Sequence, residues 1–354
     1  MGYNRGMGWE MIGHAWALDL LERHLAAGRP RHAYLFTGPT ATGKRTLALR
    51  FAQRLMCLDA PQPGGICGAC RVCRLAPAGS HPDLHVVARA EGESAIKIDA
   101  VRALQRQLAL SPHEARWRVA LLPAIHQATP EAQHALLKTL EEPPPRVILL
   151  LCAETAESIL PTIISRCEVL GLRSVPPGDI ARGLIERTVE PERAALLASL
   201  ANGRPGWALR LADEPGRLAA RAEHLDALWM LLQALPGERF GAVERWVGKK
   251  SRAAEMEERR RATVEMLEAW LGLWRDALLR AHGAQAALRN PDRAAALQAL
   301  AVGLGADAVL HALQATAAAL DAVHRNANLQ LVLETLAIEL PRLPMGTAAG
   351  STAG

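Results

Sequence analysis

Three groups of residues in this sequence have the types and spacing that chemistry requires. The first is Gly38-Pro-Thr-Ala-Thr-Gly43-Lys44-Arg45-Thr46, which follows an apolar run and precedes a helical pattern. Glycines so placed let backbone N–H groups surround phosphates, while a lysine reaches the terminal phosphates and the helix N-terminus adds positive potential. The segment predicts a phosphate-binding loop; a glycine-rich turn between strand and helix is the alternative. Its candidate binding residues are Gly38, Gly43, Lys44 and Thr46.

This loop lacks the residues that ATP hydrolysis needs. Arg45 stands directly after the lysine, where Ser or Thr would bind Mg²⁺, and Thr46 is rotated away by about 100°. A second strand, expected at Arg118–Leu122, ends in Pro123-Ala124 without the carboxylates that hold Mg²⁺ and polarise the attacking water. Because metal ligand and general base are missing together, we expect no ATP hydrolysis by this chain. Binding of ATP or ADP stays open.

The second group is a set of four cysteines with the spacing C-x9-C-x2-C-x2-C inside a stretch rich in Pro and Gly. Four thiolates on a short loop complete the tetrahedral shell of a closed, structural Zn²⁺ site. A redox C-x-x-C pair or unrelated core cysteines are the alternatives, and neither explains four cysteines within seventeen residues. His81 and His85 are expected to be ordinary loop and strand residues. The predicted zinc ligands are Cys57, Cys67, Cys70 and Cys73.

The third group is Ser165-Arg166-Cys167, which ends the segment Ile159–Cys167 and follows a short helix in it. Taken alone, an arginine at such a place is most often a surface residue in a salt bridge. Upstream, Thr129–Pro145 has a capping Thr, Pro at the first helical position and an acidic first turn. This pattern predicts a well-capped surface helix.

Elements that would position these groups follow from the hydrophobic pattern. Short apolar runs at 33–37, 84–87, 118–122 and 147–152 alternate with helical patterns, which predicts an α/β domain with a parallel sheet. After Leu172 the pattern is helical throughout and is interrupted only by Gly and Pro. Leu267, Leu271, Trp274 and Leu278 keep the spacing of a bundle helix. The last helix is expected to start near Asn328 and to end before Pro341 or Pro344.

Composition and charge limit the kinds of partner and the cellular location that we expect for this protein. A net charge of +5 is compatible with a nucleic-acid partner, but 4% aromatic residues leave little material for base stacking. No run approaches the roughly 18 uninterrupted apolar residues of a membrane span, and the N-terminus lacks the apolar core of a signal peptide. We therefore expect a soluble, cytoplasmic protein without a membrane partner, in which cysteines serve metal binding rather than disulfides.

Together these segments resemble bacterial clamp-loader subunits, which are AAA+ proteins of the DNA polymerase III holoenzyme. The resemblance covers about residues 9–215 and is carried by Arg31–Pro39, the cysteine insert, Thr129–Pro144, Leu160–Cys167 and Gly203–Leu209. It implies a RecA-like P-loop AAA+ domain at 1–171 with a zinc-binding insert at 57–73, then a helical lid at 172–214. An all-α collar for oligomerisation at 215–343 and a disordered tail at 344–354 would follow.

Departures from the family pattern indicate the kind of subunit. The motor subunits, gamma and tau, keep a Thr after the lysine and an acidic pair after the second strand, whereas this chain has Arg45 and Pro123-Ala124. The family's first sensor falls near Ala153-Glu154 and its second sensor arginine near Gly206. Ser165-Arg166-Cys167 matches the motif by which one subunit offers an arginine finger to its neighbour's ATP.

The resemblance thus implies a non-catalytic stator subunit of a DNA-directed DNA polymerase holoenzyme. Its role would be to support ATP-dependent loading of the sliding clamp on primed DNA, with Arg166 acting in trans beside Ser165 and Cys167. Implied partners are gamma/tau and delta subunits in a hetero-pentamer, the sliding clamp and primer–template DNA. The alternatives are an ATP-hydrolysing motor subunit of the gamma/tau type and a stand-alone zinc-containing nucleic-acid-binding module. The latter predicts basic and aromatic residues flanking the insert, and only Arg71 and Arg74 are found there.

Overall fold

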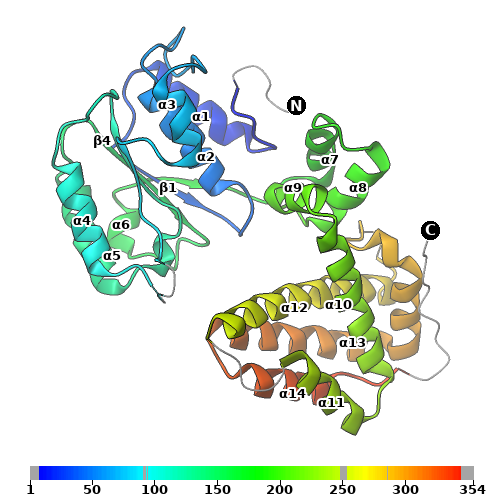
Figure 1. The fold of residues 1–354 in the computed structure, drawn as a ribbon. Helices are drawn as coiled ribbons and strands as arrows, with labels where there is room; N and C mark the ends of the chain where they lie inside the picture. Colours follow the sequence, from blue (N-terminus) through cyan, green and yellow to red (C-terminus); the bar gives the residue numbers. More distant parts are fainter. Residues whose placement is uncertain (1–7, 91–92, 94, 248–252, 285, 344–354) are drawn as a thin grey trace. The chain divides into compact units, whose positions relative to one another are not determined.

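A computed structural model describes residues 8–90, 93, 95–247, 253–284 and 286–343 (Figure 1). The chain divides into two compact units, one ending at Leu209 and the other beginning at Arg210. The first unit contains the sheet and the second is helical in its described part. The finer division into a domain at 1–171, a lid at 172–214 and a collar at 215–343 stays a prediction. The expected tail, 344–354, lies outside the described residues.

The first unit is built on a five-stranded sheet with the strand order β2-β3-β4-β1-β5, and every strand pair is parallel. All residues of β1, β3 and β4 are buried, which explains why these strands are unbroken apolar runs in the sequence. The predicted parallel sheet is confirmed. Its strands are β1 (Ala33–Thr37), β2 (Leu84–Val86), β3 (Arg118–Leu122), β4 (Val147–Ala153) and β5 (Glu168–Gly171).

Strand β5 did not emerge from the sequence pattern. It is an edge strand that pairs with β1, in the register Tyr34↔Glu168 through Thr37↔Gly171. Only Leu170 of its four residues is buried, and Val169 is 41% exposed. A strand with one buried side chain has no alternation of apolar and polar residues, so hydrophobic periodicity does not predict it.

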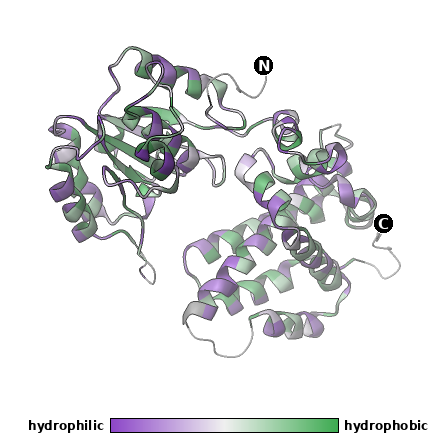
Figure 2. Cartoon of the chain, turned by 45° about the horizontal axis from the view of Figure 1, so that its top comes forward, coloured by the Kyte–Doolittle hydropathy of each residue, from purple (hydrophilic) through white to green (hydrophobic). Residues whose placement is uncertain are grey.

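Helices cover both faces of the sheet. Because side chains alternate along a strand, Tyr34 and Phe36 of β1 face a core with α1 (Ala15–Ala26) and α2 (Lys44–Met56). Leu35 faces the opposite core, against α4 (Ile98–Leu108) and α5 (Pro130–Glu141). In Figure 2 the strands are mostly green, the colour of hydrophobic residues, whereas the helices show both green and the purple of hydrophilic residues. The shorter helices are α3 (Arg71–Leu75), η2 (Ala76–Ala78), η3 (Ile125–Gln127), α6 (Pro161–Ile164), α7 (Pro177–Ile185), α8 (Pro191–Leu200) and α9 (Pro205–Asp213).

The second unit has one core formed by its long helices. Leu267 and Trp274 are buried there as their spacing predicts, whereas Leu271 and Leu278 are half-buried. The last helix has Asn328 as its N-cap, whose side chain accepts from the N–H of Leu331. The helices are α10 (Gly216–Gln233), α11 (Pro236–Val247), α12 (Ala253–Ala281), η4 (Pro291–Arg293), α13 (Ala294–His324) and α14 (Leu329–Glu339).

By length and composition alone, one helical stretch among the described residues, Pro291–His324, is apolar enough to cross a membrane. Only 28% of its most apolar window is buried. However, Leu297, Leu300 and Val309 of this stretch lie in the core of the second unit. Its helical geometry is also interrupted at Gly305, where φ is 76°. Core helices of soluble proteins pass the same test, so this stretch is weak evidence for a membrane span.

Candidate functional site: a phosphate-binding loop, a cysteine cluster and an exposed arginine

The loop between β1 and α2 needs glycine at two positions. Gly38 has φ of 140°, and a Cβ there would lie 2.2 Å from the carbonyl oxygen of Leu172. Gly43 has φ of 100° at the N-cap of α2, and a Cβ there would lie 2.9 Å from Cε of Met11. Neither position accepts a side chain without a shift of the surroundings. The structure thus places Gly38, Gly43 and Lys44 in the strand–loop–helix geometry that the sequence predicts.

Lys44 is turned back on this loop. Its Nζ donates to the carbonyl oxygens of Gly38 at 2.6 Å and Pro39 at 2.8 Å. Burial lowers the pKa of Lys44, and the nearby Cys152 and Glu154 partly oppose that shift. The ammonium group therefore binds backbone oxygens of its own loop. In a nucleotide-binding loop the same group would bind a phosphate instead.

Glu154, directly after β4, holds the loop from one side. Its Oε1 accepts from Oγ1 of Thr40 at 2.7 Å, and its backbone oxygen accepts from the N–H of Gly38 at 3.0 Å. At the start of α9, the N–H of Gly206 donates to the carbonyl oxygen of Ala41 at 2.9 Å. The family pattern indicates Glu154 only as a position near the first sensor, and its hydrogen bond to Thr40 does not follow from that pattern. The available signal was a carboxylate at the carboxyl end of a buried parallel strand.

The residues expected at the metal side of the loop lie at the start of α2 and directly after β3. Arg45 and Thr46 are exposed in the first turn of α2. Pro123 and Ala124 follow β3 and offer no carboxylate. The loop therefore combines the backbone geometry of a phosphate-binding loop with its lysine, and the lack of ATP hydrolysis by this chain stays a prediction.

All four predicted cysteines lie together. Their Sγ atoms are within 4.8 Å of one another, with separations of 3.6 Å for Cys57–Cys73, 3.8 Å for Cys67–Cys73 and 3.9 Å for Cys57–Cys70. Sulfurs at about 2.3 Å around a tetrahedral ion would be about 3.8 Å apart. This cluster could hold a metal ion, and His81 and His85 are outside it.

The thiols differ in their tendency to ionise. Backbone N–H donors lower the pKa of Cys67 to about 6, with the N–H of Cys70 at 3.3 Å from its Sγ. Burial raises the pKa of Cys57 to about 12 and also raises the pKa of Cys73. A bound cation would favour the thiolate forms that ligation needs.

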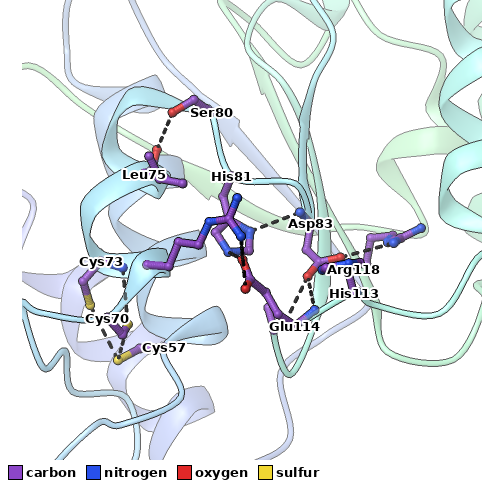
Figure 3. Close-up of polar contacts among 12 residues, drawn as sticks. Cys57, Cys70, Cys73, Leu75, Ser80, His81, Asp83, His113, Glu114 and Arg118 are labelled. Carbon is purple, nitrogen blue, oxygen red and sulfur yellow. Dashed lines mark hydrogen bonds and ion pairs between the residues drawn. The ribbon is translucent and has the colours of Figure 1, made fainter.

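A partly buried polar network joins the cysteine insert to the sheet (Figure 3). Glu114 lies 2.9 Å from Nε2 of His81 and 3.4 Å from Nη1 of Arg71, which is adjacent to Cys70. Asp83, directly before β2, is fully buried and accepts from the backbone N–H groups of residues 113, 114 and 115 at 2.6–3.0 Å. The Arg118 guanidinium adds a fourth donor at 3.2 Å. The insert is thereby fixed to the β2–β3 edge of the sheet.

Arg166 lies on the surface, after α6 and before β5. Its Nη2 donates to Oε1 of Glu141 at 2.8 Å, and its Nη1 donates to the carbonyl oxygen of Thr162 at 2.9 Å. Its side chain remains 35% exposed. Ser165 is exposed, whereas burial raises the pKa of the Cys167 thiol to about 12. Of these three residues, Arg166 is the one with a charged group that can reach outward from the chain.

Comparisons with known proteins agree on one family. Residues 13–176 match the family model described as DNA polymerase III, delta subunit. DNA polymerase III subunit delta' of Bacillus subtilis is 31% identical over 91% of this chain and 94% of the relative. The Escherichia coli delta' subunit is 36% identical over 52% of this chain and 55% of the relative. A gamma/tau subunit of Mycobacterium bovis is 35% identical over 52% of this chain and 31% of the relative.

A solved structure, that of a gamma subunit-related protein of DNA polymerase III from Thermotoga maritima, aligns with 91% of this chain and 98% of its own. The TM-score is 0.40 at 17% identity. The sequence relatives carry the assignment, because the Bacillus subtilis subunit matches almost the full length of both chains. The chain therefore belongs to the delta prime (delta') family of DNA polymerase III subunits, and its role is in the clamp loader.

Proposed function

We propose that this chain is the non-hydrolysing stator subunit of the clamp loader and donates Arg166 to the ATP site of a neighbouring gamma/tau subunit. The observation that carries the proposal is a contrast within one domain. The chain's own loop lacks a Mg²⁺ ligand at Arg45 and Ala124, whereas Arg166 presents a guanidinium at the surface. In this arrangement the chain supplies one group to another subunit's reaction and performs no hydrolysis itself.

Arg166 would act on charge that develops at the γ-phosphate of the neighbour's ATP. Arginine fingers of this kind contribute about 10³–10⁵ in rate in the systems where they are known. The ion pair with Glu141 is exposed, and such pairs contribute at most about 1 kcal/mol. A phosphate ligand can therefore replace Glu141 as the partner of Arg166 at low cost. The hydrogen bond from Arg166 to the carbonyl oxygen of Thr162 in α6 would still orient the guanidinium.

The cysteine cluster fits a structural zinc ion. Cys57, Cys67, Cys70 and Cys73 supply four sulfurs and leave no open position, so the ion would stabilise the insert and take no part in catalysis. The proposed assembly is a hetero-pentamer with gamma/tau and delta subunits, which loads the sliding clamp on primer–template DNA in the cytoplasm. The net charge of +5 favours phosphate contacts in such a complex.

Reconstitution of the loader tests the proposal. Complexes with wild-type chain, Arg166→Ala or Arg102→Ala are assembled with gamma/tau and delta subunits, and ATPase stimulated by clamp and primed DNA is measured. Arg102 is the matched control, because it is also an exposed arginine in an ion pair, with Asp99 on α4. We expect full assembly in all three and a loss of stimulated ATPase and clamp loading only with Arg166→Ala. Normal rates in that complex would exclude the finger role.

The same preparations test the motor alternative. Glu154 is a carboxylate beside the loop, so an autonomous ATPase would have to use it in place of the acidic pair that β3 lacks. Purified wild-type chain should show no ATP turnover above a Lys44→Ala control. Turnover that Lys44→Ala abolishes would instead assign a motor role to this chain.

A further inference from the structure

We propose that Glu154 opposes nucleotide binding by this chain, because its carboxylate, which accepts from the exposed Thr40 hydroxyl, places a negative charge beside the phosphate-binding loop. This inference rests on the proposed function, in which the chain hydrolyses no ATP, and it adds a reason why the chain's own loop would bind no nucleotide. It concerns Glu154, Thr40 and Lys44 and does not depend on Arg166.

Glu154 is attached to the loop at two points. Its carboxylate binds the Thr40 hydroxyl at 2.7 Å, and its main-chain oxygen binds the N–H of Gly38 at 3.0 Å. Both are donors on the segment that surrounds phosphates in a phosphate-binding loop. Because β4 fixes the backbone at Ala153, directly before Glu154, the attachment is held by the sheet rather than by a free loop.

The carboxylate also affects the charge of the site. Burial lowers the pKa values of Lys44 and His126, and the negative charge of Glu154 partly opposes both shifts, so the carboxylate acts electrostatically on both side chains. The Lys44 ammonium has two carbonyl acceptors of its own in addition. A nucleotide phosphate would therefore meet a carboxylate of like charge and a lysine that already has acceptors.

The apex of the loop is closed from a second direction. Gly206, at the start of α9, donates its N–H to the carbonyl oxygen of Ala41, and a Cβ on Gly206 would lie 2.9 Å from that oxygen. This close backbone contact leaves no space for the sensor side chain that the family pattern expects at this position. The loop is thus held by β4 through Glu154 and by α9 through Gly206.

Nucleotide binding to the full-length chain tests this proposal. Binding of fluorescently labelled ADP is titrated with EDTA present, since the loop has no metal ligand. Glu154→Gln keeps an acceptor for Thr40 and removes the charge, and Glu154→Ala removes both. Glu157→Gln is the control, because Glu157 is an exposed carboxylate three residues further along the same segment.

We expect weak or undetectable binding by the wild type and by Glu157→Gln. Affinity for ADP should rise about tenfold or more in Glu154→Gln and at least as much in Glu154→Ala, the scale of removing one like charge. Addition of Lys44→Ala to Glu154→Gln should abolish the gain. Unchanged ADP affinity in both Glu154 variants, with thermal unfolding as in the wild type, would overturn the proposal and leave the result for Arg166 unaffected.

Discussion

Arg166 and Glu141 form an ion pair of 2.8 Å that joins a residue two positions after α6 to the last residue of α5. Their side chains are 35% and 51% exposed, so water screens the attraction between them. The pair orients the guanidinium at the surface and contributes little to folding.

Arg166→Ala should accordingly leave the fold almost unchanged. We expect the free energy of unfolding to fall by less than about 1 kcal/mol, because an exposed ion pair is removed. Arg118→Ala is the contrasting variant, since Arg118 is buried and its loss leaves the carboxylate of Asp83 without one of its donors. Urea unfolding should show a much larger loss for Arg118→Ala. Similar losses in the two variants would mean that Arg166 has a structural role.

Asp83 should make the protein sensitive to acid. Burial opposes its ionisation, but the N–H groups of residues 113–115 and the Arg118 guanidinium outweigh burial and lower the pKa of Asp83 to about 2. An unfolded Asp titrates near pH 4, so the native state releases this proton more readily than the unfolded state. The stabilisation is complete above the unfolded pKa and is lost as pH falls from about 4 towards 2.

Asp83→Asn separates this effect from the titration of other carboxylates. At pH 7 the variant should be less stable than the wild type by on the order of 2 kcal/mol, and the difference should shrink as pH falls below 4. Urea unfolding at pH 7, 4 and 3 measures both quantities. A difference between the proteins that stays constant with pH would show that the ionised form of Asp83 is not preferred in the native state.

Much of the fold was predictable from local pattern, because burial on both faces makes β1, β3 and β4 unbroken apolar runs. The cysteine cluster and the loop were likewise predictable, since their residues are close in sequence and their chemistry depends on spacing. The edge strand β5 was not, because Leu170 is its only buried residue.

Contacts between segments that are distant in the sequence could not be predicted from the hydrophobic pattern. Thr40 and Glu154 are 114 residues apart, and they meet because β1 and β4 are neighbours in the sheet. Arg118 reaches Asp83 for the same reason, since β2 and β3 pair. Such contacts depend on strand order, which hydrophobic periodicity does not determine. The candidate site was therefore predictable as separate motifs and became connected only in the fold.

Removal of the metal should destabilise the first unit. We expect one zinc ion per chain, released stoichiometrically when the thiols are modified, and a lower unfolding temperature after chelation because ligation stabilises the folded insert. Cys67→Ser should lose zinc. Cys152→Ala is the control, because Cys152 is a buried thiol at the end of β4 and outside the cluster. The structural metal would be excluded if neither the wild type nor Cys152→Ala contained zinc and if chelation left the unfolding temperature of both unchanged.

Gly38→Ala tests whether the loop backbone needs its present shape. A Cβ at this position would be 2.2 Å from the Leu172 carbonyl oxygen, and φ of 140° is already unfavourable for alanine. Gly28→Ala is the matched control, since Gly28 has φ of 63° with nothing within 4 Å of a Cβ. We expect Gly28→Ala to cost about 1 kcal/mol and Gly38→Ala to cost more than about 3 kcal/mol, measured by urea unfolding. Equal costs would mean that the backbone near Leu172 can move, and that the loop is less tightly held by the sheet than its contacts indicate.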